Sequence, residues 1–94
     1  MPNPRVPLYD LEAPTLALIV TSLSRYVDED EVPALLTAAR AEAGLEPEHP
    51  ETPEVLLRLV EGLERQGDFA ATCAKGLRVR IKSYLVLAAA HRSP

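Results

Sequence analysis

The sequence has no tryptophan, one phenylalanine and three tyrosines among its 94 residues. Aromatic side chains are therefore scarce, and we expect aliphatic residues to supply the core. The single cysteine excludes an intramolecular disulfide and is typical of a reducing compartment. No apolar run approaches the roughly 20 residues that a membrane-spanning helix requires, and the opening MPNPRVPLYD lacks the apolar run of a secretory signal. These features predict one small cytoplasmic domain.

Charge is divided along the chain, although the net charge is only −4. All 14 acidic residues lie in residues 1–68 with five of the ten basic residues, so that part carries −9. Residues 69–94 hold the other five basic residues and no acid, which gives +5. A small domain with one acidic and one basic part can attract copies of itself or a relative. The competing interpretation is that these charges only solvate exposed helix faces.

Residues 1–14 are predicted to form a proline-rich N-terminal arm, and residues 15–94 a helical interaction domain. Four prolines, at positions 2, 4, 7 and 14, lack a backbone donor and disfavour helix in the preceding residue. We expect an extended arm with a short turn over residues 8–12. Its apolar side chains can hold it against the body: Leu8, Tyr9 and Leu11.

Apolar residues then recur at helical spacing in two stretches. In residues 15–27 the stripe consists of Leu16, Ile19, Val20, Leu23 and Val27. In residues 30–43 it consists of Val32, Leu35, Leu36, Ala39 and Ala43. Gly44 is expected to end the second helix. The loop LEPEHPE that follows contains two prolines, and its His49 is predicted to be a surface residue because no second His or Cys lies near it.

Four consecutive acids separate these two helices: Asp28, Glu29, Asp30 and Glu31. Asp30 can cap the second helix, with Pro33 in its first turn and the acids favoured by the helix dipole. The same acids form a patch that a partner protein could bind. A divalent metal site is a third option, but the spaced oxygen ligands and the glycine of a calcium loop are missing.

The most clearly specified stretch is residues 52–75, TPEVLLRLVEGLERQGDFAATCAK. Thr52 can cap a helix, and Pro53 suits its first position, where a missing N–H costs nothing. The apolar stripe of this helix consists of Val55, Leu56, Leu59, Val60 and Leu63. Gly67 is expected to end it in a left-handed conformation, and Asp68 to cap a second, short helix that Gly76 ends.

Residues 77–92, LRVRIKSYLVLAAAHR, fit two patterns. Leu77, Val79 and Ile81 alternate with basic residues as in a strand, whereas a helical spacing joins Leu77, Ile81, Tyr84, Leu85 and Ala88. A helix is predicted, because no second strand is available for pairing. Its first turns carry the basic residues, and its apolar second half, residues 84–90, is expected to be buried in this domain or against another.

No catalytic or cofactor motif is recognisable, and we expect no enzymatic activity, cofactor or metal. A nucleophilic cysteine needs a base and an orienting group. Cys73 has His49 and His91 as candidate bases, but it shares a stripe with Phe69 and Leu77, which indicates a buried thiol. No glycine-rich loop follows a strand, and no Cys/His set has the spacing of metal ligands.

The segment LLRLVEGLERQGDFAATCAK resembles bacterial effector-associated domains, in which an apolar helix ends in an E-R-x-G-type turn before a short helix. Those domains are similar to the death-fold superfamily of compact helical bundles, which includes the caspase-recruitment (CARD-like) type. The resemblance covers residues 52–75, and its matching positions are Leu56, Leu59, Val60, Glu64, Arg65, Gly67 and Phe69. It implies a domain that recruits partners by like-with-like contact through opposed charged surfaces, often in bacterial immunity.

The sequence therefore predicts an all-α, compact antiparallel bundle of five to six helices of the death-fold type. Its predicted function is non-catalytic protein–protein interaction, as a recruitment or adaptor domain that associates with itself or with a similar domain and takes no small-molecule substrate. The predicted partner-binding residues are Asp28, Glu29, Asp30, Glu31, Lys75, Arg78, Arg80 and Lys82. Two alternatives stay open: a small DNA-binding regulator or antitoxin that contacts phosphates through the basic residues, and a helical dimer that buries residues 84–90.

Overall fold

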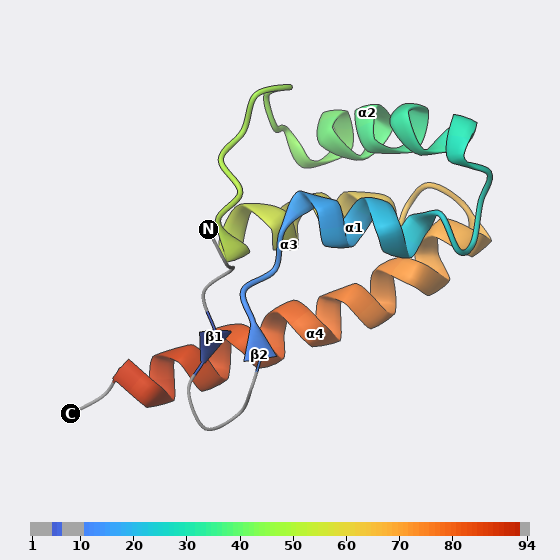
Figure 1. Cartoon of the computed structure of the whole chain (residues 1–94). Helices are drawn as coiled ribbons and strands as arrows, with labels where there is room; N and C mark the ends of the chain where they lie inside the picture. The colour runs from blue at the N-terminus through green and yellow to red at the C-terminus, as the bar shows by residue number, and fades with distance from the viewer. Residues whose placement is uncertain (1–4, 7–10, 93–94) are drawn as a thin grey trace.

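The computed structural model describes residues 5–6 and 11–92, whose regular secondary structure is helical apart from one short β ribbon. The α-helices are α1 (Leu16–Leu23), α2 (Val32–Ala43), α3 (Pro53–Leu63) and α4 (Asp68–Arg92). A 3-10 turn, η1 (Glu29–Glu31), precedes α2, and β1 (Arg5–Val6) pairs antiparallel with β2 (Leu11–Glu12). Successive helices run in roughly opposite directions, and α3 packs against both α2 and α4 (Figure 1).

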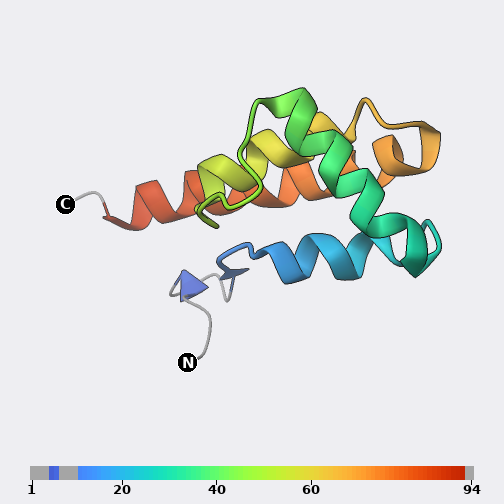
Figure 2. The same ribbon diagram turned by 90° about the horizontal axis from the view of Figure 1, so that it is seen from above.

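The longest helix, α4, has 25 residues and extends past the other helices at its C-terminal end (Figures 1 and 2). The chain measures 43 × 25 × 25 Å. Its radius of gyration is 13.5 Å, against about 12 Å expected for a compact domain of this length, so the protruding end of α4 makes it slightly elongated. No helix in the described ranges is long and apolar enough to cross a bilayer.

The core is aliphatic, as the sequence predicted. Its completely buried large side chains are Ile19, Leu23, Leu56, Leu59, Val60, Leu63 and Ile81. Four of these seven come from α3, which makes α3 the central helix of the bundle. Burying one such side chain contributes roughly 1.5–3 kcal/mol.

The helix ends predicted at Thr52 and Gly44 are confirmed, whereas α3 ends at Leu63, four residues before the predicted Gly67. Thr52 Oγ1 accepts the Val55 N–H at 3.3 Å, and Pro53 is the first residue of α3. Thr15 caps α1 in the same way, accepting the Leu18 N–H at 3.1 Å. Gly44 ends α2 with a φ of 69°, a left-handed conformation that glycine adopts without steric cost.

The predicted cap at Asp30 is wrong. Residues 29–31 form η1, and α2 begins at Val32 with Glu31 in the cap position and no side-chain cap hydrogen bond. The Asp28 carbonyl accepts the Glu31 N–H at 2.9 Å, so a backbone turn satisfies this donor in place of a carboxylate. The acidic side chains are therefore not used to start the helix.

The first helix is shorter than the predicted 15–27. It ends at Leu23, where the Ser24 hydroxyl donates to the Val20 carbonyl at 2.9 Å. Serine hydroxyls that bond to the backbone in this way compete with continued helix. Residues 24–27 form a turn in its place, which leaves the first part of α4 less covered than a longer helix would.

Gly76 does not end a helix, which is why the described residues form four α-helices where the sequence predicted five or six. Residues 68–75 and 77–92 belong to one helix, α4. Cys73, Ala74, Leu77 and Ile81 form one buried stripe that runs across Gly76. This packing outweighs the roughly 1 kcal/mol by which glycine disfavours helix. The prediction of helix over Leu77–Lys82 is confirmed.

The predicted arm, residues 1–14, is only partly described. Its described parts pair as a ribbon with Arg5 opposite Glu12 and Val6 opposite Leu11, and β1 lies beside α4. The anchoring predicted for the side chains of Leu8, Tyr9 and Leu11 falls outside what the structure describes.

The backbones of α2 and α3 approach closely at Gly62. A Cβ atom at this position would overlap the Ala39 carbonyl oxygen and lie 3.1 Å from the Ala39 carbonyl carbon. These atoms belong to a helix backbone and cannot move aside alone. By contrast, a Cβ at Gly76 would have open space around it.

The two glycines give a matched test of this contact. Gly62→Ala should lower the free energy of unfolding by about 2 kcal/mol, because overpacking costs roughly 1–3 kcal/mol. Gly76→Ala should raise it by about 0.5–1 kcal/mol, since alanine favours helix and no atom is displaced. Denaturant unfolding followed by circular dichroism measures both; stabilisation by both substitutions would contradict the close approach.

Candidate interaction surface

The acidic run predicted to bind a partner is exposed along its whole length, from Asp28 to Glu31. Within the described residues none of its carboxylates forms an ion pair. It lies at the end of the bundle where α4 begins, and Asp28 and Glu31 line a surface depression of about 380 Å³ together with Phe69.

The basic run does not form one surface, because α4 distributes it around the helix. Lys75 and Lys82 are seven residues apart and lie on nearly the same outward line. Arg80 is displaced by about 140° from Lys75 around the axis and lines a depression beside α1 with Arg25. Arg78 lies on the other edge, toward α3. A strand-like alternation in sequence thus becomes three separate directions in the helix.

Arg78 is half-buried and pairs with Glu64 at the end of α3. Its Nη1 lies 3.0 Å from Glu64 Oε1 and donates a hydrogen bond to Glu64 Oε2 at 3.1 Å. Glu64 Oε1 is buried and receives no hydrogen bond of good geometry, so Arg78 is the charge that balances it. The pair ties α4 to the end of α3, and we assign Arg78 to the fold.

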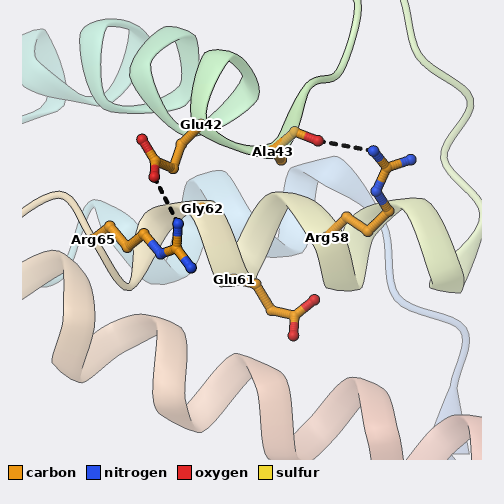
Figure 3. Close-up of a pocket in the computed structure, with 6 residues that line it drawn as sticks. All are labelled: Glu42, Ala43, Arg58, Glu61, Gly62 and Arg65. Carbon is orange, nitrogen blue, oxygen red and sulfur yellow. Dashed lines mark hydrogen bonds and ion pairs between the residues drawn. The ribbon is translucent and has the colours of Figure 1, made fainter.

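The neighbouring residue Arg65 ties α3 to α2. Its Nη1 lies 2.7 Å from Glu42 Oε1, and this hydrogen bond and the charge of Glu42 raise the pKa of the Arg65 guanidinium. Both residues line a pocket of about 260 Å³ between the two helices (Figure 3). Arg58 on the other side of this pocket donates to the Ala43 carbonyl at 2.8 Å and so satisfies a free carbonyl at the end of α2. Both arginines of the pocket therefore contact α2 and help to hold it against α3.

Phe69 is exposed over 68% of its surface, so its predicted place on the buried stripe with Cys73 is wrong. Ala70, the next residue, takes the buried position in the first turn of α4. Tyr26, in the turn after α1, is exposed over 45%. Both aromatic side chains were missed as candidate contact residues; their only signal in the sequence is their position beside helix ends.

These aromatic residues belong to one continuous surface. The depression that holds Asp28, Glu31 and Phe69 shares Arg25 and Tyr26 with a second depression, of about 170 Å³. The second depression is lined further by Ser22, Cys73, Gly76, Leu77 and Arg80. We call the exposed residues of this surface the aromatic face: Arg25, Tyr26, Asp28, Glu31, Phe69, Gly76 and Arg80. In the described part of the chain, neither of its guanidinium groups forms an ion pair.

Cys73 is buried, as predicted, and burial raises the pKa of its thiol. A protonated, inaccessible thiol is a poor nucleophile. Of the two candidate bases, His49 is engaged with Arg40 and Pro50, and the side chain of His91 lies outside what the structure describes. No group of three or more possible metal ligands occurs among the described residues.

His49 is half-buried and connects its loop to α2. Its Nε2 accepts a hydrogen bond from Arg40 Nε at 3.0 Å, and its Nδ1 lies 3.0 Å from the Pro50 carbonyl oxygen. With Nε2 as acceptor, Nδ1 carries the proton and donates to that oxygen. His49 therefore has a structural role, where the sequence predicted a surface residue.

The second half of α4 is only partly covered. None of residues 84–90 is fully buried, and Val86 is exposed. The expectation that this segment is buried within the domain is therefore not met by the described residues. Burial against another chain stays a prediction.

Charge reversal separates the two arginines of the basic run. Arg78→Glu should lower the free energy of unfolding by about 1–2 kcal/mol, because it places a second carboxylate beside Glu64 and leaves that group without its partner. Arg80→Glu should change it by less than about 0.5 kcal/mol, as is usual for an exposed residue. Denaturant unfolding of the two variants at low salt, and at a protein concentration too low for association, measures the difference; equal effects would contradict the assignment of Arg78 to the fold.

The thiol of Cys73 predicts a pH dependence of stability. The pKa of this thiol is higher in the folded chain than in the unfolded chain. Its contribution to the free energy of unfolding is therefore complete below the unfolded pKa of about 8.5, and it is lost as pH rises through the folded pKa. The free-energy difference between wild type and Cys73→Ala should therefore become less favourable to wild type as pH rises above about 8.5. A difference that stays constant over this range would show that the thiol titrates as in the unfolded chain.

The chain matches no protein-family model, no curated protein and no solved structure.

Proposed function

We propose that this chain is a non-catalytic recruitment or adaptor domain, which associates with itself or with a similar domain through acidic and basic surfaces. The observation that carries the proposal is a set of exposed charges that the fold leaves free. Two sets of exposed charges form no ion pair within the described residues. They are the acids from Asp28 to Glu31 and the cations Lys75, Arg80 and Lys82.

The contrast with the other charges supports this proposal. Two ion pairs join the end of α3 to its neighbours: Arg65 with Glu42 on α2, and Glu64 with Arg78 on α4. The free charges make no such contribution to the bundle. Charges arranged in complementary patches speed association and select partners. Binding to a partner would therefore explain the acidic run and the free cations, which do not stabilise the fold.

The finer parts of the proposal come from the resemblance of residues 52–75 to effector-associated domains. They are a death-fold-like bundle, a place in a bacterial immunity or signalling system, and a cytoplasmic location. Four α-helices and the 3-10 turn η1 are the elements available to such a bundle in the described chain.

The geometry of Cys73 and of the basic run favours an interaction domain over the other classes. A buried thiol of raised pKa supplies no nucleophile. The basic residues point in three directions around α4, and Arg78 is held by Glu64, so few cations can face one phosphate backbone at the same time.

Sedimentation velocity over a range of concentration and salt tests the proposal. We expect association at low salt that weakens as salt rises, because exposed charges are screened. Reversing the acidic run to lysine, or Lys75, Arg80 and Lys82 to glutamate, should each weaken association, and mixing the two variants should restore it. A monomer at every concentration up to about 1 mM would overturn self-association. A gel shift with duplex DNA that weakens as salt rises would favour the DNA-binding alternative.

A further inference from the structure

We propose that a second copy of this chain docks on the aromatic face by a two-fold axis, with Phe69 of each copy seated in the depression beside Gly76 of the other. This proposal rests on the proposed self-association and names its surface and its geometry. It assigns roles to Arg25, Tyr26, Phe69 and Gly76, which the charge pattern alone does not select.

The aromatic face has a polarity that suits two-fold pairing. Asp28, Glu31 and Phe69 lie at one end, around the depression of about 380 Å³. Arg80 lies at the other end, around the depression of about 170 Å³, and Arg25 and Tyr26 belong to both. A two-fold axis places the acidic end of one copy on the basic end of the other, twice in the same contact. The face is therefore complementary to itself.

The spacing along α4 allows the two ends to meet. Phe69 and Gly76 are seven residues apart, so they lie on nearly the same line of α4 and about 10.5 Å apart along its axis. When two copies of α4 run antiparallel with the axis midway between these positions, each Phe69 comes opposite a Gly76. On the same alignment Arg80 extends past the start of the partner helix, where the partner's acidic turn lies.

Gly76 provides the space that an aromatic ring requires. It is exposed, and a Cβ built on it meets no atom within 4 Å. The depression around it is also lined by the apolar side chain of Leu77 and by the buried Cys73. A glycine inside a helix lowers the stability of that helix. The contact with Phe69 of the other copy explains why this position is a glycine. Aromatic residues that fill a partner's pocket are frequent energetic centres of interfaces.

The charges at the two ends of the face become paired in the dimer. Arg25 and Arg80 have no ion pair in the described chain, and neither have Asp28 and Glu31. In the two-fold contact Arg80 of one copy faces the acids of the other, and Tyr26 lies near the axis. Such a contact is closed, so it gives a dimer and no longer chain.

Sedimentation equilibrium of the full chain tests the contact through the dissociation constant. Phe69→Ser and Gly76→Leu should each raise the dissociation constant at least about tenfold, because each change occurs twice in a two-fold dimer. Gly76→Leu should at the same time stabilise the monomer to denaturant, since leucine favours helix. A variant that folds better and associates less distinguishes a contact role from a loss of folding.

Val86→Ser is the matched control. Val86 is exposed over 67% of its surface and lies ten residues beyond Gly76, about 15 Å along the axis of α4, so this change removes a similar exposed apolar residue outside the face. Arg80→Glu should weaken the dimer, and mixing it with a variant that carries Asp28→Arg and Glu31→Arg should restore a species with the mass of two copies.

The outcomes separate this inference from the proposed function. Association that persists in Phe69→Ser and Gly76→Leu but is lost when Lys75 and Lys82 are reversed would overturn the two-fold contact and leave charge-driven recruitment standing. Growth of the mass beyond two copies with concentration would also overturn it. A monomer at every concentration would overturn the two-fold contact together with self-association, and would leave recruitment of a similar domain as the remaining form of the proposed function.

Discussion

The close contact between α2 and α3 at Gly62 is the constraint on which the rest of the bundle depends. With no Cβ at Gly62, the backbone of α3 lies directly against the Ala39 backbone of α2. This position brings the buried stripe of α3 between its two neighbours. The ion pairs at the end of α3 follow from it, because Arg65 then reaches Glu42 on α2 while Glu64 reaches Arg78 on α4. A larger side chain at Gly62 would move the helix that holds all these contacts.

The long helix α4 connects this packing to the surface. Its buried stripe attaches it to α3, and its length leaves one end beyond the bundle. Because a helix separates residues that alternate in sequence, the basic run is divided among an outward line, an internal ion pair and the side near α1. Charge alone thus says little about function until each cation is assigned to the fold or to solvent.

The early end of α1 explains why aromatic residues are exposed in a chain that has so few of them. With the helix ending at Leu23, the following turn carries Arg25 and Tyr26 and leaves Phe69 uncovered at the start of α4. Free acids lie at one end of that surface and a free arginine at the other. An apolar centre with charged ends is the usual anatomy of a protein–protein contact.

The sequence by itself determined the helical class, the aliphatic core, the caps at Thr52 and Gly44 and the burial of Cys73, because these follow from local spacing and from the backbone needs of helix ends. It did not determine whether Gly76 breaks a helix, where the first helix ends, or which cations are free. Those depended on packing against α3 and on side chains brought together from distant positions, such as Arg78 with Glu64 and Phe69 with Tyr26. Local preferences near 1 kcal/mol are outweighed when several apolar side chains are buried together, and only the tertiary structure shows where that happens.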